Sequence, residues 1–362
     1  LDKLLGKAIG STGNGIGPAY ADRALRATGQ DSSDLCLKNL RVVDGLDYDK
    51  VEKVCKDNLK QVVSQYNLKE IDVDDLVRNF NFHLVKLGSY FNDDPLFLEK
   101  QVKDGKRIFF EGAQSVMLDS DTGSVPYVTS SRTLAGAVYT GGDISVRHKL
   151  KVIGVAKAIM SRVGNGPFIS EFGGRRSELY CAVEGGKKYV KEVEREMYGT
   201  NNSSGINKLL QSDDFFEMGV ALRMLGGEYG ATTKRPRRIG MLDLVMLRQN
   251  CLMNGVDELY INKIDCLSDF KKTKLQGIPI VTGYRLGKDL IDYIPPSIDD
   301  CYQTTAEIGY LIHHLEDISK IRTFNQLPVE VKNNLLCLET AVGVEIKGIG
   351  VGPERDQFVP IK

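Results

Sequence analysis

Runs of apolar residues alternate with helix-like stretches along most of the chain. The strand-like runs lie at 107–113, 151–159, 258–264, 279–286 and 344–350. They are dense in Ile and Val and show little strict alternation, which is typical of strands buried on both faces of a parallel sheet. Because helix-like stretches separate them, we predict an α/β fold with a central, largely parallel sheet flanked by helices.

Three further stretches carry the pattern of helices. Residues 48–66 place Val51, Cys55, Leu59, Val62 and Tyr66 on one face, and residues 304–320 do the same with Ile308, Leu311, Ile312, Leu315 and Ile318. Apolar residues at this spacing predict amphipathic helices. A third helix is expected to begin near Pro328 and to end close to Gly343, because proline suits a first helical turn and glycine a helix end.

Residues 183–228 are more polar and more highly charged than the stretches around them. Helices are expected on both sides of a loop at 199–206. We therefore predict one α/β domain over residues 1–362, with a helical surface insertion at 183–228.

The charge balance excludes strong attraction to polyanions. Lys and Arg number 48, as do Asp and Glu, so no global field draws the protein to nucleic acid or to an acidic membrane. The seven cysteines are scattered without a C-x-x-C pair and indicate a reducing, cytoplasmic location. The four histidines lack metal-site spacing, and no apolar run approaches the roughly 20 residues that a membrane span needs.

A glycine-rich stretch, GSTGNGIGPAYADRALR, occupies residues 10–26. Such a loop ahead of a helix exposes backbone N–H groups that can bind an anion, and Thr12, Arg23 and Arg26 could complete the site. A solvent-exposed turn is the alternative interpretation.

The tetrapeptide Asn262-Lys263-Ile264-Asp265 follows a strand-like run. The Asp carboxylate can accept both N1–H and N2–H₂ of guanine, a contact that adenine cannot make, while the Lys stem lies against the purine. A surface salt bridge explains the residues equally well. A guanine site normally accompanies a phosphate loop, but the sequence has no G-x-x-x-x-G-K-[S/T] motif.

Two other segments offer polar chemistry. Residues 230–243 place four cations, Lys234, Arg235, Arg237 and Arg238, after Thr232 and Thr233, and arginine forks suit phosphates and carboxylates. A nucleic-acid patch is the alternative, but the neutral chain favours a small anion. Residues 110–142 emerge from a predicted strand with Glu111, Gln114, Asp119, Asp121 and several hydroxyls, at the position where open α/β sheets bind ligands.

Taken together, these segments resemble the adenylosuccinate synthetase family. The resemblance is carried by residues 10–20, 110–114, 128–131, 162–167, 230–233 and 262–265, in the family's order. It implies a P-loop-GTPase-like synthetase fold and a homodimeric ligase of purine biosynthesis. This enzyme would form adenylosuccinate from IMP and L-aspartate through 6-phosphoryl-IMP, with GTP as co-substrate and Mg²⁺ as cofactor.

The resemblance also implies roles for single residues. IMP would be bound by Thr12, Gln114, Thr129, Arg235 and, from the neighbouring subunit, Arg26; Gln114 would contact the reacting edge of the base. Aspartate would be bound by Ala231, Thr232, Thr233 and Arg235. GTP would be bound by Arg237, Lys263, Ile264, Asp265, Gly350, Val351 and Gly352.

Several positions depart from the family pattern. Asn14 stands where Arg is common, Lys234 where Gly is usual, and Gly350-Val351 where Ser-Thr is frequent. The family's G-D-E-G-K-G loop with its catalytic Asp, the N-x-G-H segment with its catalytic His, and the Mg²⁺ ligands are not found. Since the chain begins at Leu1, we expect an N-terminally incomplete synthetase that is inactive alone. The alternative is a non-catalytic nucleotide-binding relative.

Overall fold

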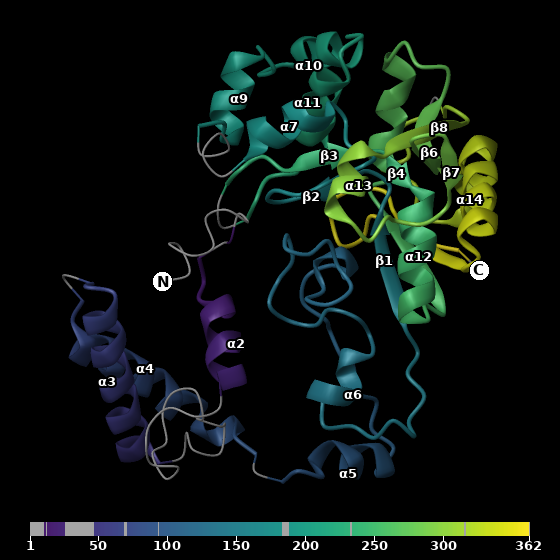
Figure 1. Cartoon of the computed structure of the whole chain (residues 1–362). Coiled ribbons are helices and arrows are strands. Elements are labelled where there is room, and N and C mark those ends of the chain that lie inside the picture. Colours follow the sequence, from purple (N-terminus) through teal and green to yellow (C-terminus); the bar gives the residue numbers. More distant parts are fainter. Residues whose placement is uncertain are drawn as a thin grey trace.

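The computed structural model describes residues 11, 13–25, 47–68, 71–92, 94–182, 188–231, 234–314 and 316–361. These residues form three sheets with helices around them (Figure 1). The predicted fold class, a largely parallel sheet flanked by helices, is confirmed.

The main sheet has the order β1-β5-β9-β10. Its strands are β1 (Ile153–Lys157), β5 (Glu258–Asn262), β9 (Ile346–Gly350) and β10 (Phe358–Pro360). The first three are parallel, and only β10 is antiparallel to its neighbour. Ile261 and Ile349 face each other across β5 and β9 and are fully buried. The carboxyl ends of the three parallel strands therefore lie along one edge of the sheet.

Two smaller sheets complete the β structure. In one, β2 (Met160–Arg162) pairs antiparallel with β3 (Arg238–Gly240). The other contains β4 (Leu242–Asp243), β6 (Ile278–Leu286), β7 (Asp289–Ile291) and β8 (Thr305–Leu311). Strand β6 runs parallel to β4 but antiparallel to β7 and β8. The run predicted at 279–286 is thus a strand, but it belongs to this mixed sheet and not to the parallel one.

The predicted helix at 304–320 is wrong, because its first half is strand β8. The strand pairs with β6 from Thr305 opposite Arg285 to Leu311 opposite Ile278. The apolar side chains of Ile308 and Leu311 fit either a helix or a strand, and the available ladder of β6 decides between them. Local periodicity carries no information about that partner.

The predicted strand at 107–113 is also absent. Residues 107–113 have no regular secondary structure, and Phe109 keeps 81% of its surface exposed. A strand requires a neighbour that accepts and donates its backbone hydrogen bonds. No described strand pairs with this run, so its high β propensity has no ladder to join.

Two predicted helices are confirmed. Helix α3 (Tyr48–Gln65) packs against α4 (Val73–Leu87), and Val51, Cys55 and Val77 form a small separate core between them. Helix α14 (Val329–Val342) begins directly after Pro328 and ends at Gly343, whose φ of 76° is the left-handed conformation that glycine adopts readily at a helix end.

Of the remaining helices, those from α7 to α13 lie beside the sheets, whereas α2, α5 and α6 lie away from them (Figure 1). They are α2 (Ile16–Leu25), α5 (Phe97–Lys103), α6 (Ala137–Gly141), α7 (Gly174–Cys181), α9 (Lys191–Met197), α10 (Ser203–Leu210), α11 (Phe215–Leu225), α12 (Leu244–Asn254) and α13 (Ile298–Gln303). Short 3₁₀ turns lie at Gly88–Tyr90, Val116–Leu118, Asp265–Lys272 and Phe324–Gln326. Among the described residues, no helix has the length and apolar content that crossing a membrane requires.

The segment predicted as a surface insertion is helical, as expected, but it is not confined to the surface. Helices α9 and α10 lie on the two sides of a loop at 198–202, shorter than the predicted loop at 199–206 because α10 begins at Ser203, and α11 follows them. Phe216, Val220 and Leu222 of α11 are buried in the main core. Its apolar residues therefore cover the sheets, and only the description of 183–228 as an insertion stays a prediction.

Candidate active site

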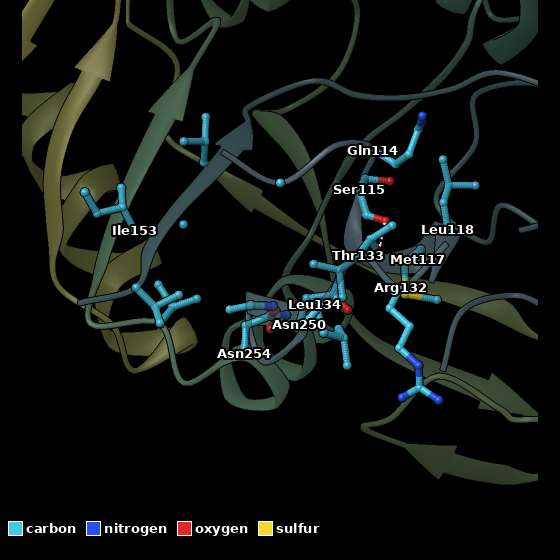
Figure 2. A pocket seen from close by; sticks show the side chains of 18 of the residues that line it. Gln114, Ser115, Met117, Leu118, Arg132, Thr133, Leu134, Ile153, Asn250 and Asn254 are labelled. Carbon is cyan, nitrogen blue, oxygen red and sulfur yellow. Dashed lines mark hydrogen bonds between the residues drawn. The ribbon is translucent and has the colours of Figure 1, made fainter. Parts of the chain in front are cut away.

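A cavity of about 1990 Å³ lies between β1 and the long connection that precedes it. Gln114, Ser130, Thr133, Arg162 and Arg237 are among its lining residues, together with all of β1. Figure 2 shows Gln114, Ser115 and Thr133 on one side and Ile153 of β1 on the other. Since a pocket for one small molecule typically measures roughly 300–1,000 Å³, this cavity has room for more than one ligand.

The wall that carries Gln114 is organised by Asp119, which is 2% exposed. Its carboxylate accepts the backbone N–H groups of Asp121 at 3.0 Å, Thr122 at 3.1 Å and Thr133 at 2.6 Å. Burial alone would raise the pKa of Asp119, but these hydrogen bonds outweigh it and hold the pKa at about 2. Asp119 is therefore a charged anchor for the loop and not a group turned toward a ligand.

Gln114 and Thr129 lie on this anchored loop. The backbone of Gln114 has a φ of 69°, an uncommon conformation for a residue other than glycine, and its exposed side chain lines the cavity. The N–H of Thr129 donates to the carbonyl of Leu118 at 2.8 Å, which holds Thr129 next to the lining residue Ser130. Gln114 thus lines the cavity, whereas Thr129 lies on the same loop but is not among the lining residues.

The carboxyl edge of the parallel sheet brings a second predicted group together. Lys157, Asn262 and Gly350 end β1, β5 and β9, and the N–H of Ile264 donates to the carbonyl of Gly350 at 3.1 Å. A Cβ on Gly350 would come within 2.6 Å of the Asn262 side-chain oxygen, so a larger residue there would displace that side chain. Ligands of parallel α/β sheets bind at this edge.

Glu228 connects the sheet edge to the arginine-rich loop. Its carboxylate, 2% exposed, lies 2.9 Å from Lys157 Nζ, 3.1 Å from Lys263 Nζ and 2.8 Å from Arg237 Nη1. Burial favours the neutral acid, but the hydrogen bond and charge of Lys157, together with Lys263 and Arg237, lower the pKa of Glu228 to about 2. One carboxylate holds three cations, so the cluster keeps a net positive charge that suits an anionic ligand.

The loop that carries these arginines folds back on itself. The N–H of Arg237 donates to the carbonyl of Glu228 at 3.0 Å, and the N–H of Gly230 donates to the carbonyl of Arg235 at 2.8 Å. Arg235 is 5% exposed, and burial lowers the pKa of its guanidinium. Ala231 lies exposed at the turn.

Arg238 has a structural role. Its guanidinium is 2% exposed and donates to Glu171, with Nε 2.9 Å from Oε1. The same guanidinium lies 3.6 Å from Glu178 of α7. Of the four cations in this segment, Arg237 is the one whose side chain lines the cavity, while Arg238 fixes β3 to the elements beneath it.

The other residues predicted to bind GTP lie beside Lys263. Asp265 begins the 3₁₀ turn after β5, and burial raises the pKa of its carboxyl. Val351 is fully buried, and its N–H donates to the carbonyl of Gln357 at 2.9 Å. Gly352 packs so closely on the Gln357 side chain that a Cβ would come within 2.2 Å of it.

Four predicted residues, Thr12, Arg26, Thr232 and Thr233, lie outside the described residues. Around the first two, Gly13 and Gly15 have φ values of 76° and 80°, and α2 begins at Ile16. Arg23 of α2 lines the cavity. The prediction that a bare loop precedes a helix is thus confirmed, and one of its arginines lies at the cavity.

Sequence reasoning missed Glu228 and Lys157. Lys157 lies near the end of the predicted strand at 151–159 and ends the observed β1, and a cation near the carboxyl end of a parallel strand was a usable signal. The sequence carries no signal for Glu228, because its role depends on cations from three segments that come together only in the folded protein. Among the described residues, no three His, Cys, Asp or Glu side chains lie close enough to hold a metal ion.

A parallel sheet whose carboxyl edge carries a cationic cluster beside a large cavity is typical of α/β proteins that bind nucleotides. The sequence matches the adenylosuccinate synthetase family model over residues 2–359. The chain belongs to the adenylosuccinate synthetase family. Members of this family are GTP-dependent ligases that join IMP and aspartate, so the family and the function predicted from the sequence are confirmed.

Three relatives illustrate the match. "Adenylosuccinate synthetase 2" of Cupriavidus pinatubonensis is 36% identical over 357 residues, which are 99% of this chain and 72% of the relative. Adenylosuccinate synthetase of Frankia alni is 32% identical over 361 residues, again 99% and 72%. The solved structure of fully ligated adenylosuccinate synthetase from Plasmodium falciparum has a TM-score of 0.78 and 28% identity, and the match covers 99% of this chain and 72% of that one.

The matches cover 99% of this chain and 72% of these relatives, and neither share tests the expectation that the chain is N-terminally incomplete and inactive alone, which stays a prediction. The alternative of a non-catalytic relative is not favoured, since the matched proteins are named as synthetases.

Proposed function

We propose that this protein ligates IMP and L-aspartate with GTP to form adenylosuccinate, the first committed step of AMP synthesis from IMP. The observation that carries the assignment to these residues is the Glu228 cluster. It ties Lys263 of the guanine element to Arg237, which lines the same cavity as Gln114. This contact supports the proposal that the GTP residues lie next to the residue assigned to IMP.

The chemistry requires activation before substitution. The 6-oxygen of IMP is a poor leaving group, so it is phosphorylated first: N1 loses its proton, O6 attacks the γ-phosphorus of GTP, an O6–P bond forms and the bond to the β-phosphate oxygen breaks, which releases GDP. The amine of aspartate then attacks C6, the C6–O6 bond breaks, and inorganic phosphate leaves with that oxygen while the amine loses a proton. The protein contributes mainly positioning and charge stabilisation.

IMP is assigned to the Gln114 wall of the cavity. The amide of Gln114 can hydrogen bond the base near its reacting edge, and the anchored loop of Asp119 keeps that side chain in place. Thr129 is assigned to the 5′-phosphate, together with Thr12. Gln114 is the residue we expect to contact the reacting atoms.

Aspartate and GTP are assigned to the two sides of the arginine loop. Arg235, with Ala231, Thr232 and Thr233, would bind the aspartate carboxylates, and Arg235 would also lie near the ribose of IMP. Arg237 would face the GTP phosphates, and Lys263, Ile264 and Asp265 the guanine. At Gly350, Val351 and Gly352 no hydroxyl is available, so only backbone groups can contact the nucleotide there.

Mg²⁺ is proposed as the cofactor, because transferring a phosphoryl group from GTP develops charge that a divalent cation neutralises. The described acidic side chains do not gather into a ligand set for it.

The proposed active unit is a homodimer in which Arg26 reaches the IMP site of the neighbouring subunit. Arg26→Ala should then raise the KM for IMP without lowering the midpoint of thermal unfolding. Sedimentation velocity would check the oligomeric state, and unchanged kinetics in the variant would count against the intersubunit role.

The proposed location is the cytoplasm. Six cysteines among the described residues are free thiols, as expected for a reducing compartment.

Product formation tests the proposal. The protein is incubated with IMP, aspartate, GTP and Mg²⁺, and adenylosuccinate is followed by chromatography, with each substrate omitted in turn as the control. We expect product only in the complete mixture. Binding of IMP and GTP without product would instead identify a non-catalytic nucleotide-binding protein.

A further inference from the structure

A buried charged network lies next to the arginine loop without belonging to the cavity. Glu194 of α9 is 0% exposed and Arg223 of α11 is 1% exposed. Arg223 Nη1 donates to Oε1 of Glu194, and the hydroxyl of Tyr229 donates to Oε2 of Glu194 at 2.5 Å. In Figure 1, α9 and α11 lie together in the group of helices beside β2 and β3.

The same network reaches the other arm of the loop. Arg223 Nε donates to the backbone carbonyl of Arg237 at 2.6 Å. Tyr229 and Pro236 form an isolated antiparallel bridge, so the two arms that begin at Tyr229 and end at Arg237 run side by side. Glu194 and Arg223 are therefore hydrogen-bonded to both arms of the loop at its base.

Burying charged groups of this kind lowers stability unless every hydrogen-bonding and charge partner is present. A well-packed apolar group can often replace a buried ion pair without loss of stability, so stability alone does not explain this one. The network instead fixes how these groups are oriented, because the planar guanidinium of Arg223 donates through one nitrogen to Glu194 and through another to one backbone carbonyl. That carbonyl belongs to Arg237, two residues beyond Arg235.

We propose that Glu194 is a positioning residue for the substrate-binding loop, acting through Tyr229 on one arm and through Arg223 on the other. The inference rests on the proposed function, because it assumes that Arg235 and Arg237 bind aspartate and GTP. It gives the helical segment that contains α9 and α11 a role in the reaction. Glu194 itself touches no substrate.

Glu194→Gln tests this role, since it keeps the shape of the side chain and removes its charge. Misplacement by about 1 Å can cost on the order of 100-fold in rate, so a partial loosening is expected to raise the KM for aspartate and for GTP on the order of tenfold. A purely structural role would lower the folded fraction, and with it kcat, and would leave both KM values unchanged. Glu196→Gln, an exposed position on the same helix, is the matched control.

Tyr229→Phe provides a second variant that keeps the ion pair. It removes one hydrogen bond to Glu194 and should raise the same KM values by less than Glu194→Gln does. If Glu194→Gln does not fold, the KM values of Tyr229→Phe alone test the positioning role. KM values equal to those of Glu196→Gln, in an enzyme that makes adenylosuccinate, would overturn the positioning role.

A direct binding measurement separates this inference from the proposed function. If the unmodified protein forms no adenylosuccinate, the proposed function fails, and calorimetry with GTP still compares the variants. Weaker GTP binding in Glu194→Gln than in Glu196→Gln supports the positioning role, and equal binding rejects it.

Discussion

Lys263 Nζ lies 3.1 Å from Oε1 of Glu228, and this contact joins two motifs that are separate in the sequence. Lys263 follows β5 in the guanine-type element, whereas Glu228 begins the arginine loop. Through Glu228 the same charge cluster also includes Lys157 of β1. The geometry of the parallel sheet therefore determines which cations surround the proposed GTP site.

Glu228→Gln should strongly destabilise the fold. The change leaves Lys157, Lys263 and Arg237 close together without their shared counter-charge; because these cations are partly exposed, the loss should be about 2–3 kcal/mol, below the range for breaking a fully buried pair. Urea unfolding measures the loss. The control is Asp213→Asn, which breaks an exposed pair with Lys274 and should cost under about 1 kcal/mol. Equal losses in the two variants would show that the cluster is not a structural centre.

Asp265→Asn should relax the preference for GTP over ATP. The amide can no longer accept both guanine N–H groups, so GTP binding should weaken while ATP binding changes little. Steady-state kinetics with each nucleotide gives the ratio of kcat/KM values. Asp269→Asn, in the same 3₁₀ turn and paired with Lys272, serves as the control and should keep the ratio of the unmodified enzyme. An unchanged ratio in Asp265→Asn would reject the guanine assignment.

Asp119→Asn should raise the KM for IMP. The carboxylate anchors Asp121, Thr122 and Thr133 through their N–H groups, and the amide that replaces it brings donors where only acceptors fit. Gln114 and Thr129 should lose their fixed positions as a result. KM measurements with varied IMP check this, with Asp104→Asn at an exposed helix end as the control. An IMP KM that stays at the control value would show that Asp119 does not influence the IMP site.

Asp243 should make stability depend on pH between about 4 and 6. It is fully buried, caps α12 through the N–H of Met246, and accepts the Tyr284 hydroxyl at 2.6 Å. Burial raises its pKa from 3.8 to about 6. The folded protein therefore holds a proton that the unfolded chain releases, so stability from this group is complete below pH 4 and is lost as the pH rises through 6.

The comparison with Asp243→Asn isolates that contribution, because the amide does not titrate. Between pH 4 and pH 7 the unmodified protein should lose on the order of 3 kcal/mol of unfolding free energy relative to Asp243→Asn. Urea titrations at several pH values measure it. A difference that stays constant over this range would mean that Asp243 does not carry the raised pKa.

Predictions from the sequence succeeded where the structure of a segment depends mainly on its own residues. The helix ending at Gly343 and the strands at 258–264 and 344–350 were predicted because propensity, pattern and end signals agree locally. The residues at 304–320 and 107–113 were assigned wrongly because their structure depends on a partner strand. Strand β8 has β6 beside it, whereas the described residues give the 107–113 run no partner.

The same distinction applies to the site. Lys263 and Asp265 were found because their spacing within four residues carries the chemistry. Glu228 could not be found in this way, since its meaning comes from cations on three segments that meet only in the folded chain. Asp119 was noticed as a possible ligand, yet its backbone partners assign it to the loop. Only the fold separates anchors from ligand-binding groups.

The most direct test follows one oxygen atom. IMP labelled with ¹⁸O at position 6 is converted in the presence of GTP and aspartate, and the released phosphate is analysed by mass spectrometry. Transfer of the γ-phosphoryl group to O6 predicts one ¹⁸O atom in the phosphate for each adenylosuccinate formed. Product accompanied by unlabelled phosphate would contradict the account.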